Sequence, residues 1–444
     1  MNAPSDTPPT PTSFRRRVTG NFGIRVAGLG LQFAGSVLIA RLLGVEAFGV
    51  YTFAFTCVVI TGILMSLGME QLSVRELPRF VVRGQTGLLR GFLTLQFGLI
   101  LTITSCVALV LFWLEERISL PLAAGWLVVG ILVHALILNV SSVLAGFQRV
   151  VQSQLLETLL RQVVFLTALG VAVYLGVDMG ATEVFGLSVL AGMGILLCMG
   201  VLAWRAMATL PASARVQPRR EMMPKLWLMA SLPLLVMTFA SQMQTNLDVL
   251  MIGVLAEAAD VGRYRAASRG ADLMLIANSI AMQVLGPMLS RALAGENTQA
   301  AQREGQRLIT QAAQLAALMG GGICLVLGMG AGFYMGLFGT DFLPATPVLR
   351  ILLVAQMLGI LCGPVVVVLI TLGRERLVLM VSLAALVVNL TLNMTLIPIF
   401  GMIGAACATF LAVLFFKGAL MVCVFRVSGF DPTLRAMWRA GSRP

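Results

Sequence analysis

The stretch NFGIRVAGLGLQFAGSVLIARLLG, from Asn21 to Gly44, is long and apolar enough to cross a lipid bilayer as one helix. A spanning helix needs roughly 20 mostly apolar residues, yet this one carries Arg25, Gln32 and Arg41. A guanidinium at the bilayer centre costs about 2.5–3.5 kcal/mol on insertion scales, so we expect each one to have a partner or a task. The stretch therefore predicts a membrane protein with a functional polar face.

The composition of the whole chain agrees with a bilayer as solvent. Of its 444 residues, 58% are hydrophobic and 11% are charged, whereas soluble domains contain about 25% charged residues. The net charge is +12, but the basic residues occur in short blocks between apolar runs. That arrangement is typical of topology signals rather than of a nucleic-acid surface, so we expect no nucleic acid as partner.

The sequence contains no arrangement typical of an enzyme or of a metal site. Its seven cysteines each stand alone in an apolar stretch, and His134 is the single histidine. GxSxG and P-loop patterns are absent. We therefore expect no catalytic site, no metal and no cofactor.

Twelve apolar segments are long enough to span the bilayer as helices, which predicts an all-α polytopic membrane protein. They lie at about 20–43, 47–69, 91–114, 122–146, 156–176, 184–204, 227–254, 262–290, 307–336, 345–371, 377–397 and 402–425.

The basic residues between these segments predict the orientation of the chain. The two tails and the even-numbered loops hold 22 Lys and Arg residues, against two, Arg117 and Arg263, in the odd-numbered loops. Because positive residues stay on the cytoplasmic side, both termini are predicted to be cytoplasmic.

The longest polar break lies near the middle of the chain and suggests two halves. We expect a disordered cytoplasmic tail at 1–19, a six-helix bundle at 20–204 and a cytoplasmic linker at 205–226. A second six-helix bundle at 227–425 and a basic cytoplasmic tail at 426–444 follow.

Short matching motifs favour an internal duplication. Gly49 and Tyr51 recur as Gly262 and Tyr264, and a Gly-x-x-Arg motif follows spans four and ten. Because six spans per half is an even number, the two bundles would form a parallel repeat around a central cavity, and rocking of one against the other would give alternating access.

Polar residues of the first span share a helical face. Arg25 and Gln32 lie seven residues apart and so point the same way, and Gly28 and Gly35 beside them permit the close approach of another helix or a ligand. Arg41 points elsewhere, and we expect it to be structural.

A similar face occurs in the second half. Arg265, Arg269 and Asp272 follow one another at i, i+4 and i+7, and Gln283 lies deeper on the same span. Asp248, on the preceding span, would form an ion pair with one of the arginines or take part in coupling, as would Asp272. Two arginines against one aspartate, with Arg25 in addition, leave a positive cavity. Because a guanidinium binds phosphate through two hydrogen bonds, this suggests an anionic, phosphorylated substrate.

Three motifs carry a resemblance to a known family. ARLLGVEAFGVYTF (Ala40–Phe53), VGRYRAA (Val261–Ala267) and IPIFGMIGAACAT (Ile397–Thr409) resemble segments of the bacterial lipid-linked oligosaccharide flippases, the Wzx-type polysaccharide transporters. The motifs also fit the wider superfamily of multidrug, oligosaccharidyl-lipid and polysaccharide exporters.

The resemblance implies a flippase of the bacterial inner membrane. Its substrate would be an undecaprenyl-pyrophosphate-linked oligosaccharide for O-antigen, capsule or exopolysaccharide, met by cationic residues in a central cavity. Membrane lipids and a polysaccharide polymerase or export machinery are the expected partners. We carry the cationic role to Arg25, Arg265 and Arg269 only.

Two other functions are compatible with twelve spans. A multidrug or cation antiporter of the same superfamily would need a cavity lined by carboxylates, and in the first half Glu70 and Glu157 lie near the ends of their spans. A membrane scaffold for glycosyltransferases or a polymerase would not need polar faces. The sequence does not indicate the sugar, the energy source or the oligomeric state.

Overall fold

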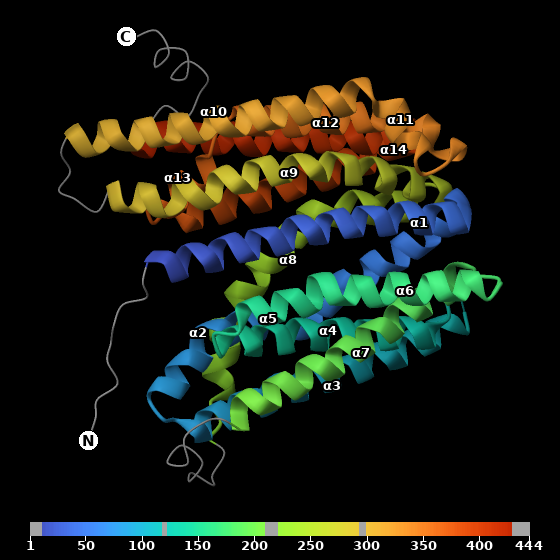
Figure 1. Ribbon diagram of the computed structural model, residues 1–444, viewed down its shortest axis with the longest axis horizontal. Helices are drawn as coiled ribbons and strands as arrows, with labels where there is room; N and C mark the ends of the chain where they lie inside the picture. Colours follow the sequence, from blue (N-terminus) through green and yellow to red (C-terminus); the bar gives the residue numbers. More distant parts are fainter. Residues whose placement is uncertain (1–10, 118–121, 209–220, 293–298, 429–444) are drawn as a thin grey trace. The chain divides into compact units, whose positions relative to one another are not determined.

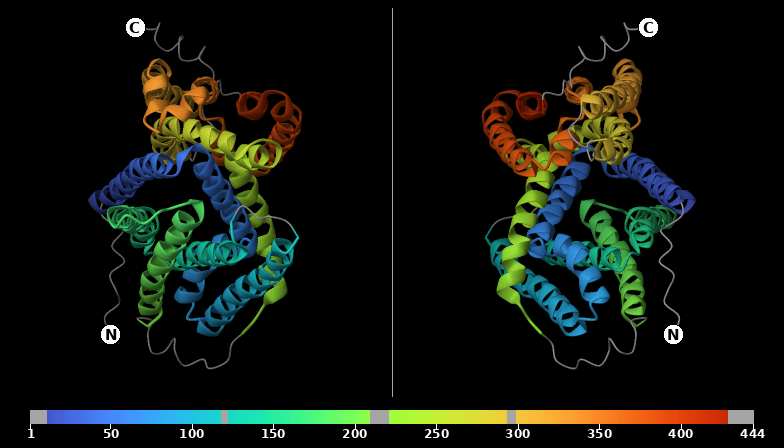
Figure 2. Two further views of the ribbon diagram at one scale, coloured as in Figure 1. Left: turned by 90° about the vertical axis from the view of Figure 1, so that its right-hand side faces the viewer. Right: turned by 90° about the vertical axis from the view of Figure 1, so that its left-hand side faces the viewer.

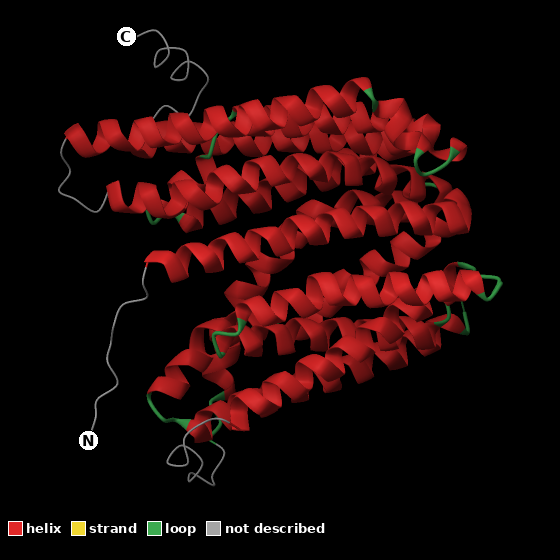
Figure 3. Cartoon of the chain, in the orientation of Figure 1, coloured by secondary structure: helices red, strands yellow, loops and turns green. Residues whose placement is uncertain are grey.

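The computed structural model describes residues 11–117, 122–208, 221–292 and 299–428 of the chain. Within these ranges the secondary structure consists of helices joined by short loops, with no strand (Figure 3). This follows from the apolar sequence, because a bilayer offers no water to hydrogen-bond the backbone and a helix satisfies its own N–H and C=O groups.

The helices follow one another along the chain with few long connections (Figure 1). The first half contains α1 (Pro11–Ser66), α2 (Met69–Val82), α3 (Thr86–Glu115), α4 (Ala124–Gly146), α5 (Val150–Gln154), the π-helix η1 (Leu155–Leu160), α6 (Arg161–Tyr174) and α7 (Ala181–Ala208). The second half contains α8 (Pro224–Leu255), α9 (Ala258–Ala292), α10 (Gln299–Met329), α11 (Ala331–Gly336), the 3-10 helix η3 (Thr340–Ala345), α12 (Thr346–Leu361), α13 (Val365–Thr371) and α14 (Glu375–Ser428). Helix α1 begins at Pro11, inside the stretch expected to be a tail.

Nine helices of the described residues are long and apolar enough to cross a membrane. Large apolar side chains on them point outward, for example Leu109, Leu197 and Leu318, which are 73%, 72% and 77% exposed. A water-soluble protein would bury such side chains, so the protein is a multi-pass membrane protein. Twelve spans remain a prediction.

Two of these helices are each interrupted at a glycine whose backbone angles other residue types adopt only with strain. Gly44 (φ 75°, ψ 177°) divides α1 and Gly401 (φ 56°, ψ −136°) divides α14. L-residues rarely adopt such angles. The predicted spans 20–43 and 47–69 lie on either side of Gly44, and 377–397 and 402–425 on either side of Gly401.

The chain forms two compact units. The N-terminal unit comprises Met1–Ser36 and Cys57–Phe239, and the C-terminal unit comprises Val37–Thr56 and Ala240–Pro444. The units divide inside α1 and α8. The linker predicted at 205–226 stays a prediction, since its residues 209–220 lie outside the described ranges. The two predicted six-helix bundles stay a prediction.

In the N-terminal unit, α4 packs against α2, α3 and α7. Helix α2 also lies beside α3 (Figure 2). Phe80 of α2, Phe92 of α3 and Trp227 of α8 form an aromatic cluster, with ring centroids 5.2 Å apart for Phe92 and Trp227. This cluster holds the C-terminal end of α2 against α3 and α8.

In the C-terminal unit, α9 packs against α10 and α12. Nine buried residues from α9, α10, α13 and α14 form an apolar cluster at one end of the unit: Leu285, Leu289, Leu308, Ile309, Val365, Val368, Leu369, Leu420 and Val424. These contacts hold α9, which carries the predicted arginines, in a fixed position within the unit.

The two Gly-x-Tyr motifs contact each other within the C-terminal unit. A side chain at Gly49 would overlap the carbonyl oxygen of Ala258, and one at Gly262 would overlap the carbonyl oxygen of Val45. Each glycine thus meets the carbonyl four residues before the other glycine. The reciprocity is what two related segments around a pseudo-twofold axis would give, although the repeat itself stays a prediction.

Candidate functional site

A half-buried stripe of charged residues lies along α9. Arg265, Arg269 and Asp272 are partly exposed, while Ala266, Gly270 and other residues of the opposite face are buried. The buried face packs on α11 and α12, since Gly270 leaves no room beyond the ring of Tyr334 and the side chain of Leu349. Packing of that face leaves the side chains of the arginine stripe partly exposed.

The stripe contains two arginines and one carboxylate. The Arg269 Nη1 and Asp272 Oδ2 atoms are 3.9 Å apart, a distance at the limit of an ion pair, with side chains 23% and 28% exposed. The Nε atom of Arg269 is buried and has no hydrogen-bond partner among the described residues. Arg265 has Arg269, Asp272 and two tyrosine hydroxyls as its electrostatic neighbours. The stripe therefore keeps a net positive charge and at least one unused donor.

Two hydrogen bonds to other segments of the chain anchor this part of α9. The Tyr334 hydroxyl, on α11, donates to the backbone carbonyl of Ala266 at 3.1 Å. At the start of α9, Arg263 donates to the backbone carbonyl of Asp341 at 3.0 Å. Both bonds fix the position of α9 along its axis and its rotation about that axis. The arginine side chains are therefore held in place before a substrate binds.

A second polar cluster surrounds Asp248 of α8, which is only 6% exposed. Its Oδ2 atom accepts hydrogen bonds from the hydroxyl of Tyr264 on α9 (2.6 Å) and from the hydroxyl of Thr409 on α14. Its Oδ1 atom accepts one from Nδ2 of Asn393 (2.9 Å), and the same amide contacts Oδ1 of Asn389. The Oδ1 atom of Asn393 is buried without a partner among the described residues.

The expected ion pair of Asp248 with Arg265 or Arg269 is not present in the described part of the chain, where hydroxyl and amide groups take its place. Neutral donors stabilise a carboxylate less than a guanidinium would. The cluster therefore gathers several oxygen atoms around one carboxylate, a donor set that suits a proton or a small alkali cation. No spacing in the sequence connects Thr409, Asn389 or Asn393 with Asp248, because these residues lie on α14, far along the chain.

In the N-terminal unit, Gln32 is half-buried on α1, and its backbone carbonyl accepts a hydrogen bond from Ser36 at 2.9 Å. A side chain at Gly28 would overlap Thr158, and one at Gly35 would overlap Gln162. The close approach permitted by these glycines is thus made by η1 and α6. The side chains of Arg25 and Gln283 lie outside the part of the chain that the structure describes.

The N-terminal unit has a buried polar network that we did not predict. Asn139 of α4 donates to the Ser66 hydroxyl at 2.7 Å, Gln96 of α3 donates to Asn139, and Ser73 of α2 donates to Gln96 at 3.0 Å. All four residues are at most 1% exposed. The network ties together four helices around the break between α1 and α2. Its members are ordinary polar residues far apart in sequence, so no local signal identifies it.

Glu157 and Arg161 lie four residues apart, a spacing that favours an ion pair on an α-helix. Instead, Oε2 of Glu157 accepts a hydrogen bond from the Ser141 hydroxyl at 2.7 Å. Glu157 lies in the π-helix η1, whose wider turn changes the spacing that an α-helix would give to residues four apart. Arg41 is structural, as expected, but donates to the backbone carbonyl of Leu337 at 2.7 Å.

The comparisons with known proteins agree with this fold. A model of the family described as polysaccharide biosynthesis protein matches residues 16–293, more than half of the chain. The chain belongs to this family. No curated protein sequence matches it.

Solved structures show which fold the family member adopts. The chain is similar to the lipid II flippase MurJ in an inward closed conformation, with a TM-score of 0.66, 14% identity, and coverage of 95% of this chain and 90% of that one. It is also similar to an inward-facing multidrug resistance MATE family transporter of the MOP superfamily, with a TM-score of 0.66, 13% identity and coverage of 90% and 95%. A MOP superfamily transporter from Pyrococcus furiosus gives a TM-score of 0.55 at 14% identity, with coverage of 96% and 95%. At these identities the likeness shows a MOP superfamily fold.

Proposed function

We propose that this polysaccharide biosynthesis family member is a flippase for undecaprenyl-pyrophosphate-linked oligosaccharide repeat units in the bacterial inner membrane. The units would serve the synthesis of O-antigen, capsule or exopolysaccharide. The family description and the lipid II flippase among the similar structures support a lipid-linked substrate. Both chain termini would be cytoplasmic, and alternating access of a cationic cavity would carry the headgroup across.

The observation that carries this proposal is the arginine stripe of α9. Two guanidinium groups lie one helical turn apart beside a single carboxylate, which is 3.9 Å from Arg269, and the buried Nε atom of Arg269 has no hydrogen-bond partner in the described residues. A diphosphate supplies the acceptor oxygens and the negative charge that such a stripe needs. Arg25 and Gln32 would contribute from the first helix, and Gln283 from deeper on α9.

Substitution of the stripe tests the proposal. Arg265→Gln or Arg269→Gln should lower flipping at least about tenfold, because a buried charge-assisted hydrogen bond is worth about 1.5–3 kcal/mol. Arg265→Lys should fall between wild type and Arg265→Gln, since lysine keeps the charge and loses the two-pronged geometry. The measurement is the amount of lipid-linked sugar that stays in the cytoplasmic leaflet of cells or vesicles. Arg291→Gln is the matched control, an exposed arginine of the same helix.

The outcome also separates the flippase from a multidrug or cation antiporter. If deletion of the protein leaves the lipid-linked sugar distribution and the polysaccharide unchanged but alters tolerance to cationic drugs, the flippase proposal is wrong. If the control Arg291→Gln lowers flipping as much as Arg265→Gln, general basicity rather than the stripe explains the effect.

The Asp248 cluster would couple transport to an ion. A carboxylate that is 6% exposed and held by hydroxyl and amide groups can exchange a proton or an alkali cation without breaking an ion pair. Asp272, already beside Arg269, is the second acidic residue for this role. Coupling at Asp248 is tested by the substitution Asp248→Asn.

A further inference from the structure

Glu70 is a buried acid beside a break in the backbone of the N-terminal unit. It lies in the first turn of α2, directly after Leu67 (φ 47°) and Gly68 (φ 75°), which end α1 in left-handed conformations. The residue is 7% exposed, and both of its carboxylate oxygens are buried without a hydrogen-bond partner among the described residues. A buried carboxylate in this state is costly when it is charged.

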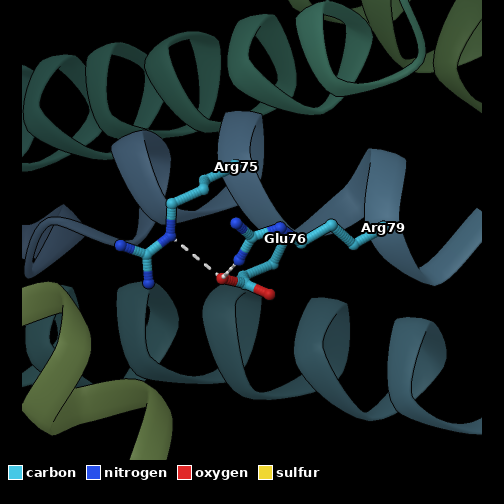
Figure 4. Close-up of polar contacts among 3 residues, drawn as sticks. All are labelled: Arg75, Glu76 and Arg79. Carbon is cyan, nitrogen blue, oxygen red and sulfur yellow. Dashed lines mark hydrogen bonds and ion pairs between the residues drawn. The ribbon is translucent and has the colours of Figure 1, made fainter.

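A second glutamate of the same helix shows the contrast. Oε1 of Glu76 lies 2.9 Å from Nε of Arg75 and 3.0 Å from Nη1 of Arg79, so that both arginines pair with one oxygen (Figure 4). These arginine side chains are 51% and 57% exposed. The basic residues of α2 thus neutralise Glu76 at the surface and leave Glu70 without a counter-ion.

The neighbouring elements offer no replacement. Helix α2 packs against α3 and α4, and Gly68 abuts the backbone of α8 at Ser231 and Leu235. The charged or titratable residues on these elements within the N-terminal unit are Arg90, Cys106 and Glu115 of α3, His134 of α4 and Lys225 of α8. None of them forms an ion pair or hydrogen bond with Glu70 in the described part of the chain.

The polar groups nearest in sequence are occupied as well. Ser66 and Ser73, four residues before and three after Glu70, both belong to the buried network with Gln96 and Asn139. Burial therefore raises the pKa of Glu70, and its own backbone amide acts in the opposite direction. The positive end of α2 also favours the charged form, by about 0.3–1 kcal/mol.

We propose that Glu70 is a proton-binding site of the N-terminal unit, occupied when the α1–α2 break has the geometry seen here. The reaction is simple protonation: the carboxylate takes one proton from water and returns it, with no other bond made or broken. Loss of the proton leaves an uncompensated charge next to Leu67 and Gly68, a segment without regular helical hydrogen bonding. The first turn of α2 can then move toward water or toward a cation.

The titration can be observed in the purified full-length protein in lipid nanodiscs, without any substrate. Infrared difference spectra between about pH 5 and about pH 8 should show the carbonyl band of a protonated carboxylic acid that disappears as the pH rises. Measured in an Asp248→Asn background, which removes the other buried carboxylate that can bind a proton in the described part of the chain, the band should be lost in Glu70→Gln and kept in Glu76→Gln. Glu76 is the matched control because it lies on the same helix and is paired with two arginines.

Thermal stability gives a second readout with a defined sign. Because the pKa of Glu70 is raised in the folded protein, the folded state binds the proton more tightly than the unfolded state does. The resulting stabilisation is full at low pH and is lost as the pH rises through the folded-state pKa. Glu70→Gln is neutral at every pH. The Tm of the wild type should therefore fall relative to that of Glu70→Gln toward high pH.

Three results would overturn the proposal. The carbonyl band could persist in Glu70→Gln, or the two melting temperatures could differ by the same amount at every pH. Sodium or potassium could also raise the Tm of the wild type at high pH but not that of Glu70→Gln, in which case the carboxylate holds a metal cation instead of a proton. None of these measurements involves the transported lipid, so failure of the flippase proposal would leave them unaffected.

Discussion

At the scale of single residues, the C-terminal unit treats its charged groups in two ways. Asp248 is enclosed by hydroxyl and amide donors and is 6% exposed, whereas Arg265 and Arg269 stay half-buried beside a single carboxylate. Sequence spacing predicted that the two arginines lie on one helical face, and in the structure they do. The partners of Asp248 are Tyr264 of α9 and Asn393 and Thr409 of α14. The two on α14 lie 145 and 161 residues from Asp248 along the chain, so spacing alone could not predict them.

The Asp248 cluster leads to a prediction about coupling. Asp248→Asn keeps the size of the side chain and removes its charge, so we expect a folded protein whose transport falls at least about tenfold, a change of about 1.4 kcal/mol in the transport barrier. Tyr264→Phe removes one donor and keeps the carboxylate. It should lower the unfolding free energy by about 1–3 kcal/mol while transport is retained. Leaflet distribution of the lipid-linked sugar and thermal melting measure the two effects, and equal transport in Asp248→Asn and wild type would exclude coupling at this residue.

At the scale of helices, glycine decides where elements bend and where they meet. Gly44 and Gly401 interrupt long apolar helices with backbone angles that other residues avoid. Gly49 and Gly262 let α1 and α9 touch backbone to backbone. The apolar pattern predicted the helices themselves, and the Gly-x-Tyr motif was visible in both halves. That the two motifs contact each other follows only from the folded chain.

The contact between α1 and α9 should be sensitive to one methyl group. Gly49→Ala or Gly262→Ala places a Cβ atom on a backbone carbonyl, which cannot move aside as a side chain would. We expect each to lower the unfolding free energy by about 1–3 kcal/mol and to reduce the folded yield. The control is Gly322→Ala in the middle of α10, where the added methyl group meets open space. This substitution should be neutral or stabilising by up to about 1 kcal/mol. Equal melting temperatures for Gly49→Ala and Gly322→Ala would contradict the close contact.

At the scale of the whole molecule, the distribution of basic residues carries a prediction about topology. The chain has the fold of MOP superfamily transporters, and the 22-to-2 asymmetry of Lys and Arg between loops predicts two cytoplasmic termini. A fluorescent protein fused after Pro444 should therefore fluoresce. Alkaline phosphatase fused after Arg117 should be active, because that loop would face the periplasm. A dark fluorescent protein after Pro444, or an inactive phosphatase after Arg117, would show that the predicted orientation or the number of spans is wrong.

The sequence by itself determined the solvent, the helical class and the family. Long apolar runs leave a bilayer-spanning chain no alternative to helices, because every backbone polar group must bond within its own segment. The motifs at Ala40–Phe53 and Val261–Ala267 carried the resemblance, and both lie within residues 16–293, which the family model matches. Helical spacing also placed Arg265, Arg269 and Asp272 on one stripe, since it depends only on 3.6 residues per turn.

Only the tertiary structure decided which polar groups are satisfied. Glu70, placed by its sequence position near the end of a span, is 7% exposed and unpartnered, while Glu76 six residues later has two arginines. The expected pair of Asp248 with an arginine, and the pair that spacing favours between Glu157 and Arg161, gave way to hydroxyl groups from other helices. Burial and hydrogen-bond partners depend on how distant segments pack, and helical periodicity contains no information about that packing.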